Sequence, residues 1–186
     1  MKFKIKPQGV ALALTLAILS PLSALAADGT ITFQGSITNG TCAVSTSGGS
    51  SNMTVTMPNT PSSALAKAGA TSQNISFNIN LSKCSADMFN NVSAYFESPN
   101  TNPATGNLKN TILTGGASNV EVQLLDRSSS PINLLYSPEE QRSTSSVTNS
   151  IINGAAVMSY NARYIATGMS KPGPINTSTN YTVVYW

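Results

Sequence analysis

Histidine is absent from this chain, and several other residue types are scarce. Only two cysteines are present, and charged residues make up 9% of the sequence. Without histidine, neither a serine triad nor a cysteine–histidine pair can be assembled in the usual way, and a zinc or copper site has too few ligands. We therefore expect no metal, no cofactor and no enzyme activity.

Six of the seven Asp and Glu residues are the remaining candidates for catalysis: Asp87, Glu97, Glu121, Asp126, Glu139 and Glu140. A carboxylate pair for glycoside hydrolysis is arithmetically possible. However, strand alternation predicts that Glu121 points out of the core, and Glu139 and Glu140 fall in a polar stretch, residues 137–150, that we expect to be a loop. No aromatic sugar platform flanks any of them, so a glycosidase is not favoured.

The first 26 residues have the pattern of an export signal. Lys2, Lys4 and Lys6 form a basic head, residues 9–19 are almost wholly apolar, and Ala24-Leu25-Ala26 fits a cleavage site. The apolar stretch is shorter than the roughly 20 residues of a membrane-spanning helix, and no later run approaches that length. We expect residues 1–26 to be a signal peptide, with no retained transmembrane segment.

Net charge in the rest of the chain is close to zero. Ten Lys and Arg less the three in the basic head leaves seven, against seven Asp and Glu, all of which follow residue 26. A nucleic-acid surface needs clustered Lys and Arg, so we expect no nucleic-acid partner. About 160 residues after the signal fit one domain.

Cys42 and Cys84 are the two cysteines. In an exported chain an isolated pair is most simply a disulfide, with two free thiols or a metal pair as the alternatives.

Period-two alternation of apolar and polar residues recurs along the chain and predicts about eight short strands. Helix-like composition is confined to residues 62–68, before Gly69. The expected strands include residues 53–57, 75–81, 92–97, 120–124, 155–166 and 181–186. This spacing predicts an antiparallel β-sandwich of immunoglobulin type.

Residues 27–35 also alternate, and they directly follow the signal. Ala27, Gly29, Ile31 and Phe33 would line one face of a strand. No hairpin turn leads back to this strand, so we expect it to pair with another molecule.

Several segments together resemble the subunits of chaperone-usher fimbriae, the type 1 pilins of Gram-negative bacteria. The resemblance covers essentially the whole chain after the signal. It rests on the alternating start, the Cys42 segment, the run from Gly69 to Cys84, residues 120–127 (VEVQLLDR) and residues 162–168 (ARYIATG). The most specific features are a glycine fourteenth from the C-terminus, Gly173, and a penultimate tyrosine, Tyr185.

The resemblance implies an incomplete immunoglobulin-like β-sandwich that lacks its seventh strand, with residues 27–34 as an N-terminal donor-strand extension and residues 35–186 as the pilin domain. The donor residues would be Ala27, Gly29, Ile31 and Phe33, which enter the groove of a neighbouring subunit. The residues expected at the groove edge and in contact with the chaperone are Gly173, Tyr181, Val183, Tyr185 and Trp186.

The resemblance also implies a function, a location and partners. The chain would be a structural subunit that polymerises by donor-strand exchange into an extracellular, adhesive fimbrium after passing through the periplasm. Its partners would be identical or related pilin subunits, a periplasmic chaperone, an outer-membrane usher and a host or surface receptor reached through the fibre. Major and minor subunits remain alternatives.

Two features depart from the family pattern, and one functional alternative remains. The extension before Thr30 is short, and the family often ends in a polar residue where this chain has Trp186. Trp186 would stack at the chaperone, stack at the subunit junction, or simply pack.

The alternative function is a carbohydrate-binding fimbrial adhesin or another exported β-sandwich lectin. However, tip adhesins of the family carry a lectin domain ahead of the pilin domain and lack an extension.

Overall fold

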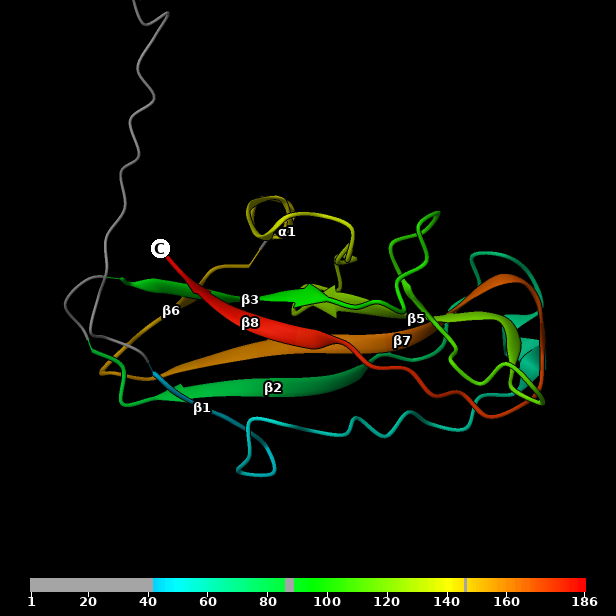
Figure 1. The fold of residues 1–186 in the computed structure, drawn as a ribbon, viewed down its shortest axis with the longest axis horizontal. Coiled ribbons are helices and arrows are strands. Elements are labelled where there is room, and N and C mark those ends of the chain that lie inside the picture. The colour runs from blue at the N-terminus through cyan, green and yellow to red at the C-terminus, as the bar shows by residue number, and fades with distance from the viewer. Residues whose placement is uncertain (1–41, 86–88, 146) are drawn as a thin grey trace, which may run out of the picture. The chain divides into compact units, whose positions relative to one another are not determined.

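The computed structural model describes residues 42–85, 89–145 and 147–186 (Figure 1). This part of the chain is almost entirely β-structure, and every strand pair in it is antiparallel. Its elements are β1 (Ala43–Thr46), η1 (Ser62–Leu65), β2 (Ile75–Ser82), β3 (Asn91–Glu97), β4 (Leu108–Lys109), β5 (Ser118–Asp126), α1 (Pro138–Thr144), β6 (Asn149–Ser150), β7 (Ala156–Lys171) and β8 (Asn180–Tyr185). The predicted donor residues Ala27, Gly29, Ile31 and Phe33 lie outside the described residues.

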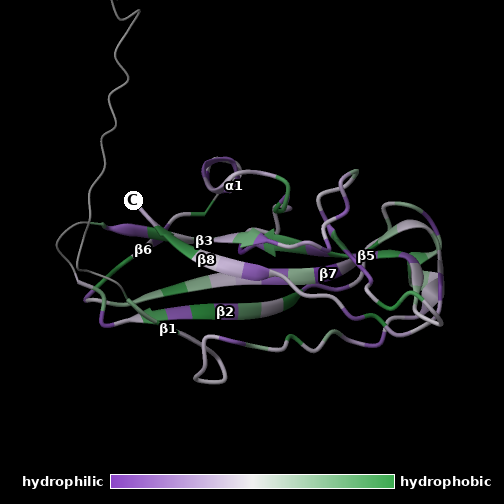
Figure 2. Ribbon diagram, viewed as in Figure 1, coloured by the Kyte–Doolittle hydropathy of each residue, from purple (hydrophilic) through white to green (hydrophobic). Residues whose placement is uncertain are grey.

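The strands form two sheets that enclose one main hydrophobic core. The five-stranded sheet has the order β1-β2-β7-β5-β4, and the three-stranded sheet has the order β6-β3-β8. Hydrophobic and hydrophilic residues alternate along β2, as the ribbon colours in Figure 2 show. This pattern places hydrophobic residues on one side of the sheet, because successive residues of a strand face opposite sides. Phe96 of β3 meets Tyr160 of β7 edge to face, with ring centroids 4.9 Å apart. This is the expected incomplete immunoglobulin-like β-sandwich.

A disulfide joins Cys42, just before β1, to Cys84, just after β2. The two strands are neighbours in the larger sheet, where Ala43 pairs with Ser82. The predicted disulfide is therefore confirmed. It closes a loop with a sequence separation of 42 residues, which contributes roughly 4 kcal/mol in the chain-entropy model.

Most of the predicted strands are present. β2, β3, β5, β7 and β8 match the alternating segments, and β5 and β7 extend beyond the predicted ends. The run from Met53 to Met57 differs, because it shows the alternating half-burial of a strand but pairs with no other described strand. At residues 62–68, the predicted helix is reduced to the single 3₁₀ turn η1, and Gly69 follows with a φ of +82°.

The loop prediction for residues 137–150 is wrong. This stretch contains α1 and β6. Ser137 caps α1 through a capping box with Glu140, and a proline stands at the start of the helix. A Ser-x-x-Glu pattern followed by a helix is a known start signal, so local side-chain bonds explain why the segment is helical.

Glu121 points out of the core, as alternation predicted, but it is not exposed to solvent. Its side chain lies on the face of β5 opposite the core, but it is buried, with 5% of its surface exposed. Residues after β3 cover this face, and Asn102, Thr105 and Asn107 all donate hydrogen bonds to the Glu121 carboxylate. A carboxylate with several donors can be buried without a cationic partner.

Candidate functional site

Strand β8 is an edge strand of the smaller sheet. It pairs with β3 from Glu97↔Asn180 to Val92↔Tyr185, and among the described residues no strand pairs with its other side. Edge strands present a row of unpaired N–H and C=O groups, which makes them templates for pairing with another chain.

The register shows which backbone groups of β8 point outward. Just beyond the strand, Asn91 and Trp186 exchange both of their backbone hydrogen bonds, each 3.1 Å long. In an antiparallel pair such bonded positions alternate with non-bonded ones. The N–H and C=O groups of Tyr181, Val183 and Tyr185 therefore point away from β3, and they have no hydrogen-bond partner in the described part of the chain. We call these three residues the open edge.

The side chains of the open edge face the space between the sheets. Each is half-buried and packs against the main core. Tyr185 lies against Phe89, with ring centroids 6.2 Å apart. The same residues thus combine free backbone groups with apolar side chains that are only partly covered.

The run after β1 approaches this edge. The Tyr181 hydroxyl donates a 2.6 Å hydrogen bond to the Ser51 carbonyl, and partial burial raises the pKa of Tyr181. Beyond Ser51, the side chains of Met53, Val55 and Met57 are half-buried and alternate with exposed threonines. This run therefore presents a second row of partly covered apolar side chains.

On the opposite side of β3, each outward-pointing residue has a partner for at least one of its backbone groups. Val92 pairs with Asn149 of β6. The Ala94 N–H donates to the Tyr160 hydroxyl at 2.8 Å. The Gln141 side chain accepts from the Phe96 N–H at 3.0 Å and donates to the Phe96 carbonyl at 2.8 Å. Since these β3 residues are opposite Tyr185, Val183 and Tyr181, the sheet is closed on one side and open on the other.

The family of this chain follows from comparison with known proteins. The family model described as "Fimbrial protein" matches residues 31–185. The chain belongs to the fimbrial protein family. It is a structural subunit of a fimbria, an extracellular fibre on the cell surface.

Curated relatives agree with this assignment. The subunit is 40% identical to the major fimbrial subunit SMF-1 of Stenotrophomonas maltophilia (strain K279a), over 89% of this chain and 97% of the relative. It is 39% identical to the F17 fimbrial protein of Escherichia coli, over 91% and 94%. It is 31% identical to the type-1 fimbrial protein A chain of Escherichia coli (strain K12), over the full length of both.

Solved structures show the same fold. The P pilus rod subunit PapA has a TM-score of 0.59 and 16% identity, covering 78% of this chain and 99% of that one. A subunit of a chaperone-usher pilus gives a TM-score of 0.56 and 17% identity, covering 86% and 96%. Within the described residues of the fimbrial subunit, no helix is long and apolar enough to cross a membrane.

Gly173 lies apart from the open edge, where the chain between β7 and β8 crosses the loop before β5. A Cβ atom on Gly173 would lie 2.4 Å from the Ala117 nitrogen and 2.8 Å from the Gly115 oxygen. The same loop bonds the chain that leads to β8, because Ala117 N–H donates to the Pro174 carbonyl at 3.0 Å and Thr111 N–H to the Asn176 carbonyl at 2.8 Å. Gly173 allows this close backbone contact.

The residues that close the far side of β3 were not predicted from the sequence. Gln141 lies in the stretch that was expected to be a loop. Burial raises the pKa of Tyr160 to about 12, so its hydroxyl stays protonated. The start signal of α1 could have placed Gln141 on a helix. Its hydrogen bonds to Phe96 could not be predicted in this way, because the two residues are 45 positions apart in the sequence.

Proposed function

We propose that this fimbrial subunit polymerises by donor-strand exchange, in which the extension of one copy pairs with the open edge of the next. The observation that carries the proposal is the open edge itself. Its backbone groups are free in the described structure, and the half-buried side chains of Tyr181, Val183 and Tyr185 lie beside them.

The extension, residues 27–34, has the chemistry that this edge requires. Strand addition uses main-chain hydrogen bonds for affinity and alternate side chains for specificity. Ile31 and Phe33 fall on one face of the predicted strand, together with Ala27 and Gly29. Full burial of a side chain such as Ile or Phe stabilises by about 1.5–3 kcal/mol, so these two would supply most of the specific affinity.

Before assembly, the open edge needs a temporary partner. A bare hydrophobic edge promotes aggregation. A periplasmic chaperone would cover Tyr181, Val183 and Tyr185 and contact Trp186. An outer-membrane usher would then exchange the chaperone for the next extension. The energy comes from completing the sandwich, so the mechanism needs no catalytic residue and no cofactor, and attachment to a surface would follow from the fibre.

A synthetic peptide tests the proposal. We define the donor-disabled chain as the full chain carrying Ile31→Asp and Phe33→Asp, which should remain monomeric while its open edge stays available. A peptide of residues 27–40 should raise its melting temperature. At a peptide concentration of about 100 Kd the stabilisation is about 2.7 kcal/mol, or roughly 5–11 °C for a domain of this size.

Matched peptides separate strand addition from nonspecific binding. A peptide with Ile31→Asp places a charge on the face that enters the sandwich and should give no shift. A peptide with Thr30→Asp carries the same charge on the opposite face and should keep most of the shift. Equal effects of the two peptides, or no shift with the unmodified peptide, would contradict donor-strand exchange.

A further inference from the structure

The last residue of the chain, Trp186, continues the β3–β8 ladder beyond the end of β8. Its N–H and C=O both bond to Asn91. It is also the only tryptophan of the protein. The contacts of this side chain therefore matter for the end of the strand.

The Trp186 ring contacts an arginine of α1. The guanidinium carbon of Arg142 lies 4.9 Å from the ring centroid, within the range of a cation–π interaction. Tyr185 faces the core, so its neighbours Val184 and Trp186 face the other side of the sheet, where α1 lies. A hollow between the two elements is lined by Pro138, Glu139, Arg142, Val184 and Trp186.

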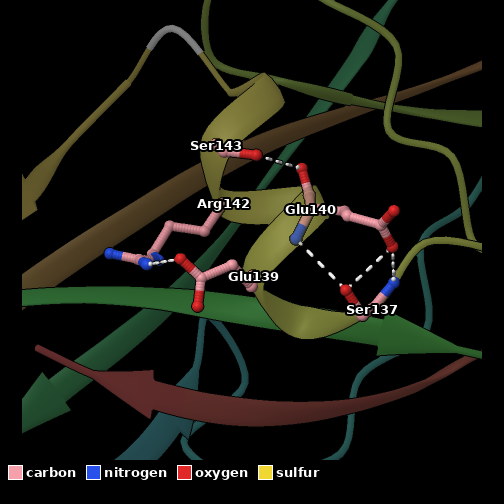
Figure 3. Close-up of polar contacts among 5 residues, drawn as sticks. All are labelled: Ser137, Glu139, Glu140, Arg142 and Ser143. Carbon is pink, nitrogen blue, oxygen red and sulfur yellow. Dashed lines mark hydrogen bonds and ion pairs between the residues drawn. The ribbon is translucent and has the colours of Figure 1, made fainter.

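The helix that carries Arg142 is itself firmly placed. Figure 3 shows its first turn, where Glu140 N–H donates to the Ser137 hydroxyl and Ser137 donates to the Glu140 carboxylate through both its N–H and its hydroxyl. These bonds to Ser137, the backbone one first, lower the pKa of Glu140. Gln141 fixes the next turn to Phe96 of β3.

Glu139 orients the arginine. Its carboxylate lies 2.6 Å from the Arg142 Nη2 atom, three residues along the helix (Figure 3). The Glu139 side chain is 78% exposed, so this ion pair adds little stability. Its effect is to direct the guanidinium, whose own side chain is 30% exposed, across the tryptophan ring.

Resting on the proposed function, we propose that Arg142 and Trp186 form a clamp that holds the C-terminal end of β8 ready for strand addition. Arg142 acts as a positioning residue. The outward N–H and C=O of Tyr185 lie between Val184 and Trp186, whose backbones bond to β3. If Trp186 is released, the ladder loses its last hydrogen-bonded pair beyond β8, and the Tyr185 groups are no longer held in line for an incoming strand.

The clamp can be tested by replacing Arg142 in the donor-disabled chain. A cation–π contact at an exposed site corresponds to about a 2- to 5-fold change in an equilibrium constant. Arg142→Ala should weaken binding of the peptide of residues 27–40 by that factor, and it should increase acrylamide quenching of Trp186 fluorescence. Arg142→Lys keeps a cation and should restore part of both effects.

The control is Arg127→Ala, which removes an exposed arginine of the connection between β5 and α1 and should change neither readout. An unchanged peptide Kd for Arg142→Ala would overturn the clamp, even if its melting temperature fell, because the arginine would then support only the fold. Unchanged Trp186 quenching would overturn it as well. Failure of the parent donor-disabled chain to bind the peptide would overturn the proposed function and the clamp together, so the two failures are distinguishable.

Discussion

Replacing Gly173 with alanine is expected to destabilise the fimbrial subunit by about 1–2 kcal/mol. The added methyl group would lie 2.4 Å from Ala117 N, 2.5 Å from the Gly116 carbonyl carbon and 2.8 Å from Gly115 O. All three are backbone atoms, so no side chain can rotate away to make room. Either the loop or the chain leading to β8 must shift.

Two opposing effects set the magnitude. Overpacking of this kind costs typically 1–3 kcal/mol, whereas alanine stabilises by about 0.4–1 kcal/mol because it restricts the unfolded chain. The steric term is larger here, because a shift of the loop also strains the 3.0 Å bond from Ala117 N–H to the Pro174 carbonyl. The melting temperature should fall by about 2–8 °C.

Urea unfolding of the donor-disabled chain, followed by the fluorescence of Trp186, measures this loss. Gly48→Ala is the matched control, because a Cβ at Gly48 has no atom within 4 Å and its φ is not in the left-handed region. That variant should change stability by no more than about 0.5 kcal/mol. Equal stability of the Gly173→Ala and Gly48→Ala proteins would refute the steric reasoning.

Two further predictions concern the closed side of β3. Gln141→Leu should lower the free energy of unfolding, measured in urea, by about 2–4 kcal/mol, because it leaves the buried N–H and C=O of Phe96 without partners. A loss below about 0.5 kcal/mol would show that other groups bond to them. Tyr160 has a pKa of about 12 in the folded chain, against 10 for the ordinary side chain, so between those pH values the unfolded chain releases a proton that the folded chain keeps. This contribution to stability is complete below pH 10 and is lost as the pH rises to 12, by up to about 2.7 kcal/mol. The Tyr160→Phe variant lacks this contribution, so its free energy of unfolding should fall less than that of the parent chain between pH 8 and pH 11. An equal fall in both proteins would contradict the raised pKa of Tyr160.

The strands could be predicted from the sequence because each buries one face, which leaves a period of two. Ile79, Met158 and Phe96 all stand at alternate positions of such runs and lie in the core. The disulfide could be predicted because the chain has only two cysteines. The resemblance to pilins places a groove edge at Gly173, Tyr181, Val183, Tyr185 and Trp186, which stays a prediction. The register of β8 shows only which of its backbone groups point outward.

Other features depend on contacts that periodicity does not encode. The helix α1 has only seven residues, so it depends on its capping box and on its contact with β3 rather than on an apolar stripe. Glu121 obeys the alternation of its strand, yet it is buried because donors from residues 102–107 fold over it. Contacts of this kind are known only once the loop is placed.

The two sides of the smaller sheet differ in a way that would give the proposed assembly a direction. Lysine side chains often protect edge strands from pairing with other chains. This protein has few charged residues, 9% of its sequence, so it cannot protect many edges in that way. The far side of β3 is closed instead by neutral side chains, the Tyr160 hydroxyl and the Gln141 amide, which bond to the backbone as a neighbouring strand would. Since β8 lacks any such cover among the described residues, an incoming strand meets a row of free backbone groups at β8, whereas Val92, Ala94 and Phe96 on the far side of β3 already have partners. Subunits that add at this edge would join in a single orientation, and a head-to-tail contact repeated in one orientation generates a fibre.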